Sequence, residues 1–214
     1  MPTRVRIVAA VGFLVLVGVA LLRSDGERTL TATTFGAVPR GFGALYALLE
    51  ELDLPVARSL RPAVELDAAA PVWWLAAPAL CDAVAPAGSA AASLRQWVES
   101  GGVAVVALPP PEAAVCSAVA GFATPRTAAE PTLPAPQRRA EGRLLPGPRD
   151  LVPDGLAAFA AADGWNVLAQ RGGRPFVQER RLGAGVLVLV ADATVFSNRW
   201  LDRGDNALFA LDLV

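Results

Sequence analysis

The polar residues that could form a functional site cluster near the carboxyl terminus. Asp192 directly follows the apolar stretch Val186 to Ala191, and a polar loop that leads into a predicted helix comes next. Open α/β sheets bind ligands beyond the carboxyl ends of their strands, so these oxygen-bearing side chains are candidates for binding a ligand or a partner. Besides Asp192 they are Ser197, Asn198, Asp202, Asp205 and Asn206.

The same residues also allow a structural interpretation. Asp192 and Asn198 could satisfy loop amides, and Asp205 could cap the following helix through the free amides of its first turn. Ca²⁺ or Mg²⁺ needs ligands at a tighter spacing than this loop offers, so no metal site is predicted. Arg40, in the turn before the first predicted helix, could receive an anion at that helix amino end or remain a solvated turn residue.

Histidine is absent from the chain, which excludes a Ser/His/Asp or Cys/His nucleophile system and any His-ligated metal site. The two cysteines, Cys81 and Cys116, could pair in an oxidising compartment or stay unpaired. Neither is expected to be catalytic. Cys81 has no glycine-flanked elbow, and the neighbouring Asp82 would raise the pKa of its thiol.

Composition indicates one folded domain with an appendage. The chain has 214 residues, 54% hydrophobic and 18% charged, which excludes a wholly disordered protein. All nineteen basic residues are Arg, and the net charge of -1 gives no basic footprint for nucleic acid. No cofactor is expected.

The first 28 residues predict a membrane anchor with its flanks. Ile7 to Leu22 carries no charge and follows Arg4 and Arg6, so the positive-inside rule predicts one helix in the cytoplasmic membrane with the amino terminus inside. Residues 29–214 would then form an extracytoplasmic α/β domain. A signal peptide cleaved near Gly18 and Ala20 and a buried soluble helix remain alternatives.

Hydrophobic periodicity predicts the elements of the domain. The expected helices are Gly41 to Leu52, Ser89 to Ser100, Leu156 to Ala162 and Asn206 to Leu213. The expected strands are Leu30 to Thr34, Val56 to Ser59, Val72 to Ala77, Val103 to Leu108 and Val186 to Ala191. Trp165 to Ala169 and Phe176 to Arg180 predict an antiparallel hairpin. From about residue 123 to 153, a Pro/Arg-rich excursion shows neither period.

These elements predict an α/β fold with an open, mostly parallel sheet flanked by helices. The sheet would be flavodoxin-like or amidotransferase-like, would carry an antiparallel hairpin at one edge, and would follow one amino-terminal transmembrane helix.

Three segments resemble a known family. VPRGFGALYALLEEL, LRQWVESGGVAVVAL and GAGVLVLVADATVFSNRWLDRGDNALFAL are similar to the family of domain of unknown function 4350. The resemblance implies a membrane-anchored, extracytoplasmic domain related to the class I glutamine amidotransferase fold. It also implies genes beside MoxR-type ATPases and other membrane proteins, which makes those systems candidate partners. The chain differs from the usual member in ending at Val214 without a second membrane helix.

Three functions follow as hypotheses. The first is a non-catalytic membrane-anchored domain that binds a protein or a small ligand in an envelope-associated complex. The second is an anchored or secreted hydrolase of glycans or peptides that uses Asp192 and Asp205 as paired carboxylates, which requires environments that separate their pKa values. The third is a structural adaptor whose Pro/Arg excursion docks a partner.

Overall fold

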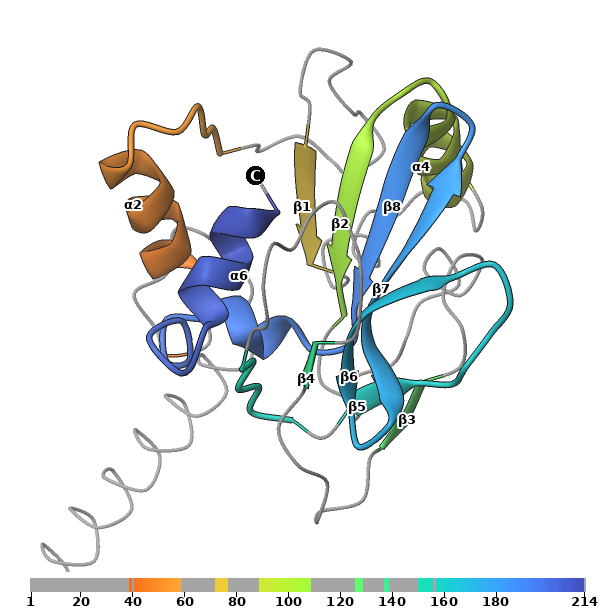
Figure 1. Cartoon of the computed structure of the whole chain (residues 1–214). Coiled ribbons are helices and arrows are strands. Elements are labelled where there is room, and N and C mark those ends of the chain that lie inside the picture. Colours follow the sequence, from red (N-terminus) through yellow and green to blue (C-terminus); the bar gives the residue numbers. More distant parts are fainter. Residues whose placement is uncertain are drawn as a thin grey trace, which may run out of the picture.

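The computed structural model describes residues 39, 41–58, 72–76, 89–108, 126–128, 137–138, 150–155 and 157–213. Its main feature is an open six-stranded sheet in the order β1-β2-β8-β7-β6-β4, and a two-stranded sheet pairs β3 with β5 (Figure 1). The strands are β1 (Val72–Ala76), β2 (Val103–Ala107), β3 (Arg126–Ala128), β4 (Gln137–Arg138), β5 (Ala157–Phe159), β6 (Asn166–Arg171), β7 (Arg174–Leu182) and β8 (Gly185–Val190).

The six-stranded sheet is mixed, which corrects the prediction of a mostly parallel sheet. β1 pairs parallel with β2, and β2 pairs parallel with β8. The pairings of β8 with β7, β7 with β6 and β6 with β4 are antiparallel. The cause is the short turn at Gly183 and Ala184, because a turn of this length joins antiparallel neighbours only. The predicted hairpin, β6 with β7, is confirmed.

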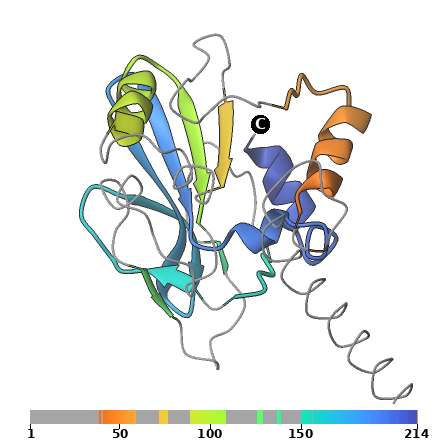
Figure 2. The ribbon, with the colours of Figure 1, turned by 180° about the vertical axis from the view of Figure 1, so that it is seen from behind.

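Helices lie on both sides of the strands. α4 (Ser89–Glu99) packs against β2, β7 and β8, whereas α2 (Gly43–Glu51) and α6 (Asn206–Asp212) lie together on the opposite side (Figure 2). The 3₁₀ helix η1 (Ala193–Phe196) connects β8 to this side. α4 ends as predicted, since Gly101 adopts a φ of 118° that a residue with a side chain rarely reaches.

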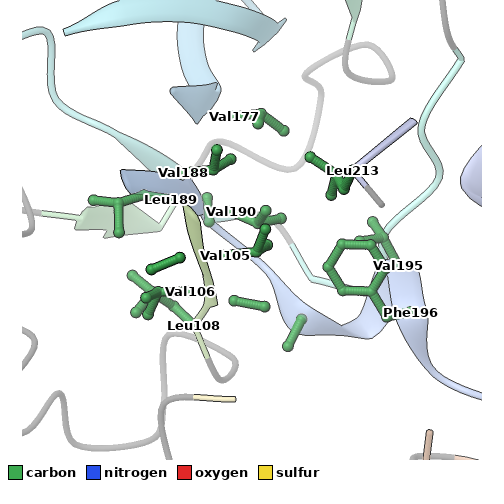
Figure 3. Packing of buried hydrophobic residues seen from close by; sticks show 14 of the residues in the cluster. Val105, Val106, Leu108, Val177, Val188, Leu189, Val190, Val195, Phe196 and Leu213 are labelled. Carbon is green, nitrogen blue, oxygen red and sulfur yellow. The ribbon is translucent and has the colours of Figure 1, made fainter. Parts of the chain in front are cut away.

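The core lies between the sheet and the carboxyl-terminal elements. Val105 of β2 and Val188 of β8 are fully buried, in keeping with strands covered on both faces. Figure 3 shows Val195 and Phe196 of η1 and Leu213 packing toward these strands. The residues just beyond β8 are therefore held by apolar packing.

Three predicted elements differ in the structure. The segment Leu156 to Ala162 was expected to be a helix, but Ala157–Phe159 is the strand β5, whose three side chains are buried and which pairs antiparallel with β3. Alanine-rich sequence favours a helix locally, and this tertiary pairing overrides it. Residues 56–58 form no strand. The Pro/Arg-rich excursion contains the short strands β3 and β4, and Leu151 near its end is fully buried.

Several other predictions concern residues outside the described ranges. The membrane segment Ile7 to Leu22, the strand Leu30 to Thr34, and Cys81 and Cys116 lie outside the described residues. Within the part of the chain that is described, no helix has both the length and the apolar character needed to cross a bilayer.

Candidate functional site

Asp192 lies at the point where β8 ends and η1 begins, and its side chain is fully buried. One carboxylate oxygen, Oδ1, accepts hydrogen bonds from the Thr194 backbone N–H at 2.9 Å and from the Thr194 hydroxyl at 2.7 Å. The other, Oδ2, accepts from the Gly155 backbone N–H at 2.8 Å. Asp192 thus satisfies backbone amides, as the structural interpretation predicted. One of them lies in η1, which it caps, and the other lies in a segment distant in the sequence.

The electrostatics of Asp192 follow from its burial. Desolvation raises the pKa of the Asp192 carboxyl, and the hydrogen bonds from Thr194 and Gly155 offset this only in part. The nearby Asp154 carboxylate raises it further. A raised carboxyl pKa alone is not a catalytic site, because the acid must also reach a substrate.

Ser197 and Asn198 stabilise the turn after η1 and tie it to the start of α2. The Ser197 hydroxyl donates to the Thr194 carbonyl at 2.8 Å. The Asn198 Oδ1 atom accepts from the Ala44 backbone N–H at 2.7 Å, within the first turn of α2. The backbone N–H of Asn198 donates to the carbonyl of Gly41. Asn198 therefore satisfies an amide at the amino end of α2.

Asp205 occupies the N-cap position of α6, but the predicted side-chain cap is wrong. Its carboxylate makes no capping bond to the helix, and its Oδ2 atom instead accepts from the Asp150 backbone N–H at 2.7 Å. The backbone N–H of Asp205 returns a bond to the Asp150 carbonyl at 2.8 Å. The approach of residue 150, far away in sequence, decides which amide this carboxylate receives.

Asn206 is fully buried and binds main-chain atoms on two sides. Its Nδ2 atom donates to the carbonyls of Val152, at 2.9 Å, and Trp200, at 2.8 Å. Its Oδ1 atom accepts from the Val152 backbone N–H at 2.9 Å. All three of these hydrogen bonds are made with the protein backbone, so the Asn206 side chain has a structural role.

Two residues that the sequence analysis missed belong to the same cluster. Thr194 Oγ1 accepts from the Asp154 backbone N–H at 2.8 Å. Arg171, at the end of β6, is only 8% exposed and donates through Nη1 to the Gly155 carbonyl. Burial lowers the pKa of Arg171, and the Asp192 carboxylate opposes this shift. Arg171 directly precedes Gly172 and Gly173 at a hairpin turn, and no local sequence signal indicates its burial.

The remaining candidates do not join the cluster. Arg40 lies outside the described residues, as do Cys81 and Cys116. Asp202 is exposed and faces Arg203, with 3.5 Å between its Oδ1 atom and the arginine Nε atom. No group of acidic or cysteine side chains among the described residues could hold a metal ion.

The cluster as a whole organises the backbone. Five side chains form hydrogen bonds with main-chain atoms of residues 150–155, and they are those of Arg171, Asp192, Thr194, Asp205 and Asn206. Both of the Asp192 carboxylate oxygens thereby have protein donors. The buried Nε atom of Arg171, in contrast, has no hydrogen-bond partner among the described residues.

Comparisons with known proteins match this architecture. A family model described as "Domain of unknown function (DUF4350)" matches residues 34–214. No curated protein matches the sequence.

Three solved structures illustrate the likeness in fold. The cytoplasmic protein STM1381 from Salmonella typhimurium LT2 is 14% identical, with 79% of this chain and 84% of that chain covered and a TM-score of 0.56. The mmIFT52 N-terminal domain is 12% identical, with 78% and 86% covered and a TM-score of 0.53. The cold-adapted β-galactosidase from Rahnella sp. R3 is 15% identical, with 89% and 28% covered and a TM-score of 0.50.

The chain spans only 20% to 29% of the length of the glycosidases that it resembles. At these identities, the likeness concerns the fold alone.

Proposed function

We propose a binding role for this chain, which belongs to the family described as domain of unknown function DUF4350. In this proposal an α/β domain is tethered to the cytoplasmic membrane by residues 7–22 and lies outside the cytoplasm. There it holds a protein partner or a small ligand in an envelope-associated complex, without catalysis of its own. The observation that supports this role most directly is the engagement of the polar side chains beyond β8 with the backbone of residues 150–155.

The hydrolase alternative needs Asp192 and Asp205 as a pair of carboxylates open to substrate. Asp192 is fully buried, and both of its oxygens accept hydrogen bonds from the protein. Asp205 uses one oxygen to bind the Asp150 backbone N–H. General acid and base groups must come within hydrogen-bond reach of the reacting atoms, so we favour binding over hydrolysis.

We propose further that the fold is a variant of the class I glutamine amidotransferase fold. The parallel strands β1, β2 and β8, with α4 packed against β2 and β8, support this relationship. Amidotransferase chemistry needs a cysteine with a histidine to deprotonate it, and the sequence contains no histidine. The scaffold is thus proposed to hold a partner, and not to cleave an amide.

The proposed location rests on the amino-terminal sequence. Arg4 and Arg6 precede the uncharged stretch from Ile7 to Leu22, a distribution that favours an amino terminus in the cytoplasm. The candidate partners are other membrane proteins and components of a MoxR-type ATPase system, as the family resemblance implies.

The test is affinity capture of the intact protein from membranes in mild detergent. Recovery of a component of the MoxR-type ATPase system, or of one defined membrane protein that the detergent-solubilised chain binds again after purification, is the expected result. A chain lacking residues 1–28 is the matched control, because it separates partners of the domain from neighbours in the bilayer. Recovery of no such component would contradict the binding role.

A parallel assay tests the absence of catalysis. The purified protein is expected to leave glutamine, esters, peptides and glycans unchanged. Turnover of glutamine that is lost in Cys81→Ser, or of a glycan or peptide that is lost in Asp192→Asn, would overturn the proposal.

A further inference from the structure

Residues 150–155, the 150–155 segment, lie on the carboxyl-terminal elements in the manner of a bound peptide. Asn206 binds the central residue, Val152, twice. Its Oδ1 atom accepts from the Val152 N–H and its Nδ2 atom donates to the Val152 carbonyl, both at 2.9 Å. A single amide side chain therefore binds both main-chain polar groups of one residue, which requires an extended backbone there.

Both ends of the segment are bound as well. Asp150 exchanges two hydrogen bonds with Asp205, one through the Asp205 carboxylate and one through its backbone N–H. At the other end Asp192 accepts the Gly155 N–H at 2.8 Å, and Arg171 donates to the Gly155 carbonyl. The main-chain atoms of the segment are thus bound by side chains from β6, from the end of β8 and from the start of α6.

The side chains of the segment alternate in their burial. Leu151 is fully buried and Pro153 is buried, whereas Val152 is half-buried and Asp154 is exposed. Extended peptides are recognised in the same way. Main-chain hydrogen bonds supply affinity, and pockets for alternate side chains supply specificity.

The loop before α6 is shaped for close approach of this backbone. Gly204 has a φ of 50°, and a Cβ atom there would lie 2.2 Å from the Asp150 carbonyl oxygen and 2.8 Å from the Val152 Cγ2 atom. We define the peptide groove as Arg171, Asp192, Thr194, Gly204, Asp205 and Asn206.

We propose that the peptide groove is a recognition site for an extended peptide of a protein partner, and that the 150–155 segment occupies it in cis until that peptide replaces it. The partner peptide carries an aliphatic residue in place of Leu151 and a proline two residues later. Between them lies a residue with a free N–H, which Asn206 requires. This inference deepens the proposed binding role and rests on it.

Because the groove residues are buried, we expect a second peptide to replace the 150–155 segment, and we do not expect the segment to leave the groove empty. Asn206 and Asp192 are both fully buried, so departure of the segment would strip hydrogen bonds from an amide and a carboxylate. A polar group that loses its partner in a buried site carries a large free-energy cost. A second peptide with the same backbone geometry restores those bonds, which makes replacement the low-energy route.

The experiment weakens the segment in cis and supplies it in trans. Val152→Pro removes the N–H that Asn206 accepts and leaves every groove residue intact. The probe is the end-blocked peptide Asp-Leu-Val-Pro-Asp-Gly, added to the full-length variant in detergent. We expect saturable binding and, at about ten times Kd, a Tm increase on the order of 4 °C. The matched control peptide carries Pro in place of Val and is expected to leave Tm unchanged.

The double variant Val152→Pro with Asn206→Ala checks that the peptide binds in the groove. Its Kd for the peptide should be at least tenfold higher than that of Val152→Pro. Equal responses to both peptides, or no response of folded Val152→Pro, would overturn the inference. Concentration-dependent dimers of the unmodified chain that disappear in Asn206→Ala would also overturn it, because the occupant would then be a second copy.

If Val152→Pro does not fold, hydrogen exchange on the unmodified full-length protein decides. We expect the amides of Val152 and Gly155 to exchange through a local opening at least 100-fold faster than those of Val188 and Val190 in β8. Equal protection at all four amides would mean that the segment leaves only on global unfolding, and the inference would fail. Since peptide binding is measured on the purified chain, failed capture of a membrane partner with successful peptide binding would count against the proposed complex alone.

Discussion

Arg171 and Asp192 hold the same residue, Gly155, from its two polar sides. Asp192 accepts the Gly155 N–H and Arg171 donates to the Gly155 carbonyl. Both side chains are buried, and the Asp192 carboxylate favours the charged form of the Arg171 guanidinium. The two residues are 21 positions apart in sequence and lie on strands that are not neighbours, β6 and the end of β8.

The first prediction concerns the pH dependence of stability. Burial raises the pKa of Asp192 above 3.8, the ordinary value of an aspartate carboxyl. The folded state therefore binds this proton more tightly than the unfolded state does. The favourable contribution is complete below pH 3.8 and is lost as pH rises through the folded-state pKa. We expect Asp192→Asn to abolish this contribution to the decrease in the free energy of unfolding with rising pH.

The measurement is the free energy of unfolding by urea at a series of pH values from 3 to 8. Asp202→Asn is the matched control, since Asp202 is exposed and should preserve the slope of the unmodified protein. If the free energy of unfolding of Asp192→Asn changed with pH in the same way as that of the unmodified protein, the assignment of the proton to Asp192 would be contradicted.

The second prediction tests whether the hydrogen bonds from Asn206 to the backbone of Val152 stabilise the fold. Asn206→Ala removes two bonds to Val152 and one to Trp200, and leaves those backbone groups short of partners. We expect a loss of about 2 to 4 kcal/mol in the free energy of unfolding, measured by chemical denaturation. The exposed Leu208 in the same helix gives the control Leu208→Ala, which should cost less than about 1 kcal/mol. Equal losses of unfolding free energy in the two variants would argue against a stabilising role of the Asn206 hydrogen bonds.

The third prediction compares two glycines that both have positive φ. At Gly204 a Cβ atom would lie 2.2 Å from the Asp150 carbonyl oxygen, whereas at Gly173 nothing lies within 4 Å. Gly173→Ala should cost about 1 kcal/mol through backbone strain alone. We expect Gly204→Ala to cost at least about 2 kcal/mol more, because backbone atoms must shift. Thermal unfolding of both variants checks this difference, and similar Tm values would refute the close approach.

The fourth prediction concerns the start of α2. Asn198→Ala removes the acceptor of the Ala44 N–H and should destabilise the protein by about 1 kcal/mol, as loss of a helix cap does. Hydrogen exchange should become faster in the first turn of α2 and stay unchanged in α4. Unchanged exchange at Ala44 would show that the amide does not depend on this side chain.

The fifth prediction concerns topology. A reporter that is active only outside the cytoplasm, fused after Val214, should be active in cells, and its activity should fall when Arg4 and Arg6 are replaced by Glu. A reporter that is active only in the cytoplasm serves as the reciprocal control, and its activity at the same fusion point would contradict the extracytoplasmic placement.

Local sequence by itself determined much of this protein. The apolar runs at 72–76, 103–107 and 185–190 form strands, and the three- and four-residue periodicity at 43–51 and 89–99 forms helices. These patterns survive because each reports how its own side chains must be buried. The family resemblance, carried in part by the segment from Gly183 to Leu211, is confirmed.

Only the tertiary structure decided the direction of the strands and the role of the polar cluster. Val186 to Val190 is apolar whether its neighbour runs parallel or antiparallel, so its sequence cannot show that β8 has one neighbour of each kind. The Asp205 carboxylate caps no amide of its own helix and instead accepts from the N–H of Asp150, 55 residues away. Arg171 precedes two glycines at a turn, and only the fold brings it beside Gly155 and Asp192. Such partners are set by long-range packing, and local patterns carry no record of it.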